Sequence, residues 1–210
     1  MITVEKISQS LKNSKNQTQF TNKAAVLVPI IEIENQLHLL FQVRSKKLKW
    51  QPNDTCFPGG RIELSDISPE YTAKRETFEE LGIALDQIII LGQLPKFIAS
   101  FGMIIYPFVA KINHLDKLND LIINYDEVES VFTVPIKWFI THPPKLATMF
   151  VGFKPDDNFP FDLIPNRTSN WQKKSQHDVY FYQYNDFVIW GLTAQIINSF
   201  ISRININDEF

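Results

Sequence analysis

Three glutamates, Glu76, Glu79 and Glu80, lie within five residues of one another in the stretch RETFEELGI. Residues three and four apart share a helix face, so Glu76 and Glu80 would be neighbours with Glu79 beside them. Like charges this close disfavour folding unless a cation offsets them. Arg75 stands at the spacing that reaches Glu79. The cluster therefore predicts either a solvated acidic face or a site for a hard cation such as Mg²⁺ or Mn²⁺, for which carboxylate oxygens are suitable ligands.

The sequence before the glutamates predicts a tight loop and then a helix. Gly59 and Gly60, in FPGG, allow the backbone to approach a metal or a phosphate closely. Ser68 is a good helix cap, Pro69 suits a first turn and Gly82 suits a helix end, so we expect a helix over 69–81. A carboxylate cluster beside such a loop indicates metal-assisted attack on a phosphoanhydride.

The same stretch resembles the Nudix box, written G-x5-E-x7-R-E-U-x-E-E-x-G-U, where U is a bulky aliphatic residue. Two positions depart from the pattern. Asp66 stands at the first Glu position, with eight rather than seven residues before the arginine, and Thr77 replaces an aliphatic residue. The matching residues are Gly60, Arg75, Glu76, Glu79, Glu80, Gly82 and Ile83.

This resemblance implies a role for each residue of the box. Glu76 and Glu80 would be the main ligands of Mg²⁺ or Mn²⁺, with the Gly59 carbonyl completing the shell. Glu79 would be a further ligand or would position water, and Arg75 would orient the carboxylates. The implied reaction is hydrolysis of a nucleoside diphosphate linked to another group.

A second pattern resembles the coenzyme A diphosphatase branch of the Nudix hydrolases. That branch carries L-L-T-x-x-S-x-x-L-R-x-x-x-G-x-x-x-F-P-G-G-x-x-D, and residues 40–63 keep its spacing as LFQVRSKKLKWQPNDTCFPGGRIE, with Gln42 at the Thr position. The implied substrate is coenzyme A or an acyl derivative, cut to 3',5'-ADP and (acyl-)4'-phosphopantetheine. The alternatives are ADP-ribose, NADH or nucleoside triphosphates as substrates, or a nucleotide-binding sensor without turnover.

Two further groups are candidates for substrate and water. The candidates to bind the 3'-phosphate of coenzyme A are Arg44, Lys46, Lys47 and Lys49, with Gly60 beside the diphosphate. The alternative is a solvated basic loop. Glu127 matches the acid of a family segment and would act as a catalytic base, with Glu129 close by. The alternative is an ordinary acidic loop before a strand.

Composition narrows the class of protein further. The chain has 210 residues, a net charge of -2 and 44% hydrophobic residues, which suits one soluble domain and gives no basic excess for nucleic acid or an anionic membrane. A single cysteine, Cys56, excludes an intramolecular disulfide. Without an apolar run of membrane length, we expect a cytoplasmic protein that acts on a small nucleotide. Its oligomeric state stays open.

The surrounding elements are predicted to form a single α/β domain over 23–210 after a polar arm or short helix at 1–22. Strands are expected at 24–33 and 37–43, joined as a hairpin, and at 88–99 and 103–112, and 128–140 is expected to be a strand followed by a turn. The proline-rich stretch 141–178 is expected to be an irregular insertion. A strand pair turning at Asn185-Asp186 and a helix over 191–204 follow. The resemblance implies a Nudix-type α/β/α sandwich with a mixed sheet.

Overall fold

A mixed sheet of eight strands forms the centre of the computed structural model, which describes residues 3–6, 9, 22–99, 102–115, 117–164 and 172–204. Its main path runs β3-β2-β1-β7-β5, with β4 and β8 beside β1 and β2, and β6 beside β7. Only the β1–β7 pair is parallel among the described pairings. The strands are β1 (Lys23–Ile33), β2 (Gln36–Arg44), β3 (Thr55–Cys56), β4 (Gly59–Arg61), β5 (Ile88–Gln93), β6 (Phe97–Ile98), β7 (Ile104–Ile112) and β8 (Val128–Pro135).

The first hairpin shows how local sequence sets this sheet. β1 and β2 are joined by Glu34 and Asn35 alone, and both have positive φ, of 50° and 61°. A two-residue turn with both central residues left-handed matches the twist of the flanking strands. This confirms the hairpin predicted from the sequence. The expected arm at 1–22 lies almost entirely outside the described residues.

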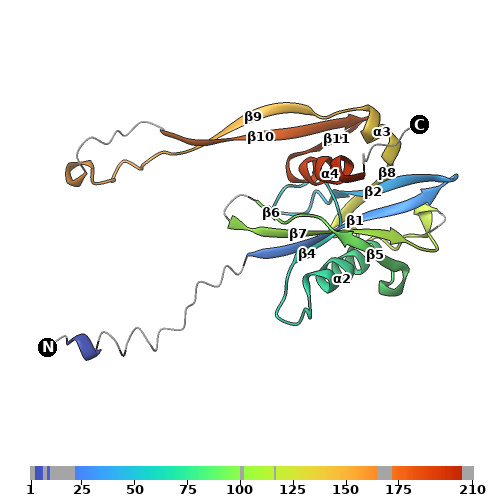
Figure 1. Cartoon of the computed structure of the whole chain (residues 1–210), viewed down its shortest axis with the longest axis horizontal. Helices are drawn as coiled ribbons and strands as arrows, with labels where there is room; N and C mark the ends of the chain where they lie inside the picture. Colours follow the sequence, from blue (N-terminus) through green and yellow to red (C-terminus); the bar gives the residue numbers. More distant parts are fainter. Residues whose placement is uncertain are drawn as a thin grey trace.

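Hydrophobic side chains cover both faces of the sheet, which gives three layers. One core packs Leu27, Ile31 and Leu40 against Ala73 and Leu81 of the helix α2 (Pro69–Leu81). The other core packs the opposite sheet face against α4 (Gly191–Ile204) and the short helix α3 (Ile136–Thr141). Figure 1 shows α2 and α4 on opposite sides of the sheet. The predicted α/β/α sandwich with a mixed sheet is confirmed.

The second core is rich in stacked aromatic rings. Phe41, which is fully buried, lies 4.9 Å from Phe57 and 5.3 Å from Phe132 between ring centroids. Phe139 and Tyr182 extend the cluster with an edge-to-face contact at 5.1 Å. Ring pairs in these geometries contribute stability beyond that of the apolar area they bury. This cluster therefore helps to hold β2, β8, α3 and the C-terminal strands together.

The stretch 141–178 corrects the prediction of an irregular insertion, because residues 145–153 and 172–178 within it are strand. A second sheet of three antiparallel strands has the order β11-β10-β9. Its strands are β9 (Lys145–Phe153), β10 (Gln172–Tyr184) and β11 (Phe187–Trp190). The predicted turn at Asn185-Asp186 and the last helix are confirmed. Short 3-10 turns lie at η1 (Leu85–Gln87), η3 (Leu118–Asp120) and η4 (Phe161–Leu163).

Two smaller differences concern strand ends. The predicted strand at 88–99 is two strands, β5 and β6, and the end of 128–140 is the helix α3. Among the described helices, none is long and apolar enough to cross a membrane.

Candidate active site

The helix α2 presents the clustered acids, and its ends follow from its sequence. The Ser68 side chain accepts a hydrogen bond from the Tyr71 amide at 3.1 Å, and Pro69 occupies the first turn. Gly82 ends the helix with a φ of 71°, which costs glycine little. Thr72, Ala73, Thr77 and Leu81 are buried against the sheet, and this orientation fixes where the glutamates lie. The predicted helix over 69–81 is confirmed.

Arg75 is the hub of the acidic cluster. Its guanidinium binds both oxygens of Asp66, at 2.9 and 3.0 Å, and it also contacts Glu76 and Glu79 at 2.9 Å each. The Asp66 side chain is fully covered, and its hydrogen bonds from Arg75 hold its pKa at about 2, well below 3.8. The same partners raise the pKa of Arg75. Arg75 thus fixes three carboxylates relative to one another.

Glu80 is the most buried acid of the cluster, with only 3% of its surface exposed. Its carboxylate accepts a hydrogen bond from the Gly59 amide at 2.9 Å. The pKa of Glu80 is raised from 4.5 to about 8, mainly by burial and in smaller part by the nearby charges of Glu76 and Glu127. The hydrogen bond from the Gly59 amide acts in the opposite direction and lowers this pKa. A metal-free protein at neutral pH therefore holds Glu80 mainly in the protonated form.

Glu76 lies against the glycine turn. A Cβ atom added to Gly60 would come within 2.3–2.5 Å of the Glu76 carboxylate, so position 60 accepts no side chain without moving that acid. Gly59 is equally constrained, with a φ of 152° and the Ala25 carbonyl 2.4 Å from the place of a Cβ. Burial also raises the pKa of Glu76, partly offset by Arg75. Gly60 therefore packs closely against the Glu76 carboxylate, and Gly59 packs closely against β1.

Glu127 joins the cluster from a distant part of the chain. It lies at the start of β8, and its charge raises the pKa of both Glu76 and Glu80. The backbone brings it there, because the Asn124 amide donates to the Glu80 carbonyl at 3.0 Å and the Glu127 amide donates to the Asn124 carbonyl. The structure thus brings Glu76, Glu79, Glu80, Arg75, Gly59, Gly60 and Glu127 to one place.

The donor set of this place suits a divalent cation. Carboxylate side chains lie together here without histidine or thiolate, and burial raises the pKa of two of them, Glu76 and Glu80. In the described residues, however, no three acid, histidine or cysteine side chains form a ready ligand group. Arg75 holds Glu76 and Glu79, and the Gly59 amide holds Glu80. A bound cation would replace some of these internal contacts.

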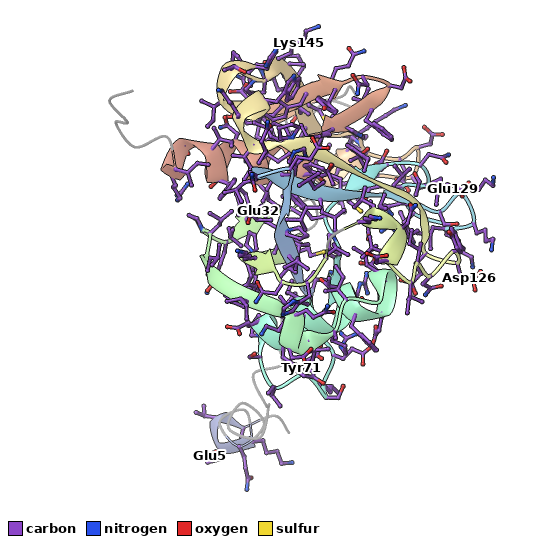
Figure 2. All side chains as sticks on the ribbon, turned by 90° about the vertical axis from the view of Figure 1, so that its right-hand side faces the viewer. Glu5, Glu32, Tyr71, Asp126, Glu129 and Lys145 are labelled. Atoms are coloured by element: carbon purple, nitrogen blue, oxygen red, sulfur yellow. The ribbon has the colours of Figure 1, made fainter. Side chains whose placement is uncertain are left out.

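The basic loop is tied to the segment that carries Glu127. Lys46 pairs with Glu129 at 3.3 Å and Lys47 pairs with Asp126 at 2.8 Å. Arg44 donates to the Trp50 carbonyl at 3.2 and 3.3 Å. Figure 2 shows Asp126 and Glu129 near each other at one side of the molecule. Lys46 would therefore leave Glu129 in order to bind a phosphate.

Gln42 is a site residue that the sequence argument did not single out as functional. It is 1% exposed on β2, and neither of its amide atoms has a hydrogen-bond partner among the described residues. It is nevertheless close enough to Glu80 to favour the ionised carboxylate. The available signal was its place in the upstream pattern, where the branch has Thr. Burial raises the pKa of the neighbouring Cys56 thiol to about 12, which disfavours the thiolate that a nucleophile needs.

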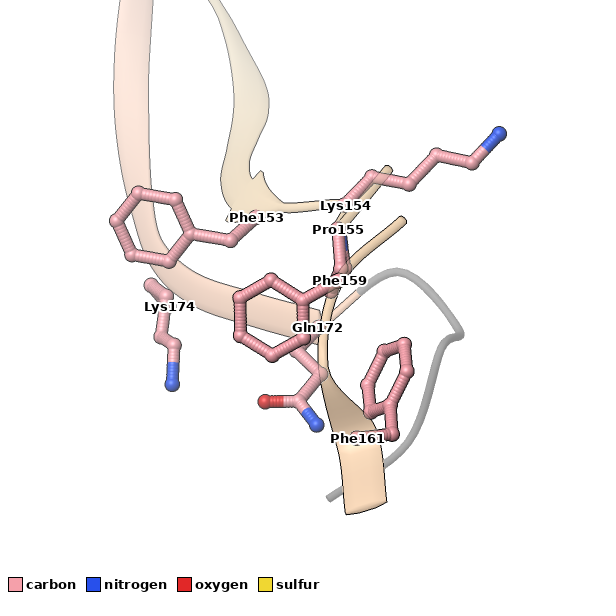
Figure 3. A pocket seen from close by; sticks show the side chains of 7 residues that line it. All are labelled: Phe153, Lys154, Pro155, Phe159, Phe161, Gln172 and Lys174. Carbon is pink, nitrogen blue, oxygen red and sulfur yellow. The ribbon is translucent and has the colours of Figure 1, made fainter. Parts of the chain in front are cut away.

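A hollow of about 350 Å³ lies away from these acids, at the distal end of β9 and β10 (Figure 3). Three phenylalanine rings line it, together with Lys154, Gln172 and Lys174. None of the described residues that line it is a carboxylate, in contrast to the acids of α2.

A mixed sheet between helices, with an acid-bearing helix packed on a Gly-Gly turn, defines the Nudix class of fold. Residues 21–149 match the family model of the NUDIX domain. The chain belongs to the Nudix hydrolase family.

Among known proteins, the chain is similar to two coenzyme A diphosphatases. It is 37% identical over 123 residues to the mouse peroxisomal coenzyme A diphosphatase NUDT7, covering 59% of this chain and 50% of the mouse protein. It is 32% identical to the Caenorhabditis elegans peroxisomal coenzyme A diphosphatase ndx-8, over 74% of this chain and 66% of that protein. The match thus spans about half to two thirds of these relatives.

A solved structure supports the fold alone. The MutT/nudix family protein from Enterococcus faecalis is similar over 97% of this chain and 70% of its own, with a TM-score of 0.55 and 15% identity.

Proposed function

We propose that this Nudix hydrolase cuts the diphosphate of coenzyme A or an acyl-coenzyme A, giving 3',5'-ADP and (acyl-)4'-phosphopantetheine. The similarity to two named coenzyme A diphosphatases carries the substrate assignment. The acids on α2 beside the glycine turn support the chemistry, because they place negative oxygen ligands where a cation would meet a diphosphate. The proposed compartment is the cytoplasm, whereas the names of these two relatives place them in peroxisomes. Cell fractionation would show which of the two compartments holds this protein.

Each residue has a proposed role in this reaction. Glu76, Glu80 and Glu79, with the Gly59 carbonyl, would hold Mg²⁺ or Mn²⁺. When bound, the cation would shield the diphosphate charge and lower the pKa of water. Arg75 keeps Glu76 and Glu79 oriented through its anchor on Asp66. Glu127, next to these acids, would accept the proton of the attacking water.

The decisive experiment incubates the protein with coenzyme A and Mg²⁺ and identifies the products by mass spectrometry. We expect 3',5'-ADP and 4'-phosphopantetheine, and near-complete loss of turnover in Glu80→Gln. Glu70→Gln, on the exposed first turn of the same helix, is the matched control and should keep turnover. Turnover of ADP-ribose, NADH or nucleoside triphosphates without coenzyme A would refute the substrate. Tight nucleotide binding without any turnover would favour a sensor.

Recognition of the 3'-phosphate is a separate part of the proposal. Arg44, Lys46 and Lys49 would supply its positive charges, with Gly60 beside the diphosphate. Replacing Lys46 or Lys49 with Gln should raise KM for coenzyme A but not for 3'-dephospho-coenzyme A, since only the former carries the phosphate. Lys137→Gln, an exposed position on α3, is the control. Equal changes in KM for both compounds would exclude this contact.

A further inference from the structure

The outer strand of the small sheet has an open edge. β9 lies at the end of the order β11-β10-β9, and β10 is its one partner among the described strands. Figure 1 shows β9 and β10 as a long ribbon that extends beyond the helix α4. Eight of the nine residues of β9 are exposed. A row of backbone donors and acceptors is therefore available along this strand.

This edge carries none of the usual protections against pairing. β9 reads KLATMFVGF, so after Lys145 it has no charge, and it has no proline. The irregularity in the ribbon lies in β10, between Lys173 and Ser175, and not in β9. Edge strands in monomers are normally short, charged, bulged or covered. An edge with eight consecutive uncharged residues indicates that another strand covers it.

The side chains of the ribbon lead to the same conclusion. The apolar residues Leu146, Met149, Phe150, Val151 and Phe153 have exposed fractions between 44% and 69%. They point to both faces, because successive residues of a strand alternate. A two-stranded ribbon with both faces in water is marginally stable by itself. Additional strands would extend the sheet and cover part of this apolar surface.

We propose that β9 pairs with β9 of a second copy of this chain, antiparallel about a two-fold axis at Met149. In this register large side chains meet small ones: Leu146 faces Gly152 of the partner copy, Phe150 faces Thr148, and Val151 faces Ala147. The charged Lys145 lies at the two ends of the pairing, away from the axis. The two ribbons then form one six-stranded sheet with a self-complementary interface.

The proposed interface is remote from the acids of α2. Figure 2 shows Lys145, at the start of β9, and Tyr71, on α2, at opposite ends of the molecule. Substitutions in β9 can therefore test the assembly without touching the residues of the Proposed function.

The test is the mass of the full-length protein in solution, by light scattering after gel filtration at about 5–100 µM. We expect twice the chain mass of 24.4 kDa for the wild type. Met149→Lys places two like charges on the axis and should return the mass to one chain. Leu91→Lys, at an exposed apolar position of β5 in the other sheet, should leave the dimer intact. A monomeric wild type, a larger assembly, or a dimer indifferent to Met149→Lys would overturn the proposal.

A cross-link tests the register without depending on the fold of the charged variant. Met149→Cys places two thiols opposite each other on the axis, so mild oxidation should give a covalent dimer. Val188→Cys, exposed on β11 of the same sheet, should give at least tenfold less. The wild type, whose one cysteine is Cys56, oxidised in the same way gives the background. Equal cross-linking at both positions would contradict the register.

Discussion

Glu80→Gln should make the metal-free protein more stable, although it removes activity. Glu80 is 3% exposed and has a pKa of about 8 in the folded chain, against 4.5 when unfolded. At pH 7 the unfolded chain has released this proton and the folded chain has kept it. Folding at pH 7 therefore requires Glu80 to take up a proton about 2.5 pH units above its unfolded pKa. At 1.36 kcal/mol for each unit, this lowers the stability of the wild type by about 3 kcal/mol. Gln has no charge to bury, and its oxygen can still accept from Gly59.

The size of the effect changes predictably with pH. Below about pH 4.5 Glu80 is neutral in both states, so its titration contributes no difference between wild type and variant. As pH rises from 4.5 to 8, the wild type loses stability relative to the variant, and the gap levels off above pH 8. The groups acting on Glu80 are the charges of Glu76 and Glu127, which enlarge the gap, and the Gly59 amide and Gln42, which reduce it.

The assay is urea unfolding of both proteins in a chelator at several pH values. Mg²⁺ should then reverse the order: at 100 times its Kd, a cation that binds only the folded state adds about 2.7 kcal/mol to the wild type and far less to the variant. Glu70→Gln, exposed on the same helix, should change neither quantity. The reasoning is refuted if Glu80→Gln is no more stable than wild type at pH 7, or if the gap is independent of pH.

Three further changes test other parts of the structure. Gly60→Ala should displace the Glu76 carboxylate and lower kcat/KM about 100-fold. Gly92→Ala is the control and should leave kcat/KM unchanged, because a Cβ at position 92 meets no atom within 4 Å. Similar kcat/KM values for the two variants would contradict the role of Gly60. Asp66→Asn should lower the free energy of unfolding by about 2–3 kcal/mol in urea at pH 7. Because the pKa of Asp66 is about 2 in the folded chain, the wild type should lose this advantage only as the pH falls below about 4. An advantage that is undiminished at pH 2 would argue against the ion pair. Phe41→Ala should cost about 3–5 kcal/mol, measured the same way, and a loss under 1 kcal/mol would deny the aromatic core.

The sequence predicted those elements whose signals are local. Ser68, Pro69 and Gly82 mark the ends of α2, and the structure places them as cap, first turn and left-handed end. The β9–β10 ribbon was missed because prolines at 143, 144, 155, 160 and 165 suggested irregular chain. None of them lies within β9, so they bound the strand rather than interrupt it. Proline density over a long window hid a nine-residue strand.

The residues of the site also divide into those that the sequence predicted and those that required the structure. The acids of α2 are related by helical spacing, so sequence alone placed them together. Glu127 was found only through its resemblance to a family segment. Gln42 is 38 residues from Glu80, and only the fold brings the two together. Such a contact has no periodicity in the sequence, so it required the structure.

The unpaired amide of Gln42 and the buried acid of Glu80 have a practical consequence for engineering. Both cost stability in the metal-free protein, and apolar or neutral replacements would relieve that cost. A screen for heat tolerance in chelating buffer would therefore enrich changes at these two positions. It would select proteins with higher thermal stability but without turnover. The same library heated with Mg²⁺ present should keep Glu80, so comparing the two selections would separate residues kept for the fold from residues kept for the cation.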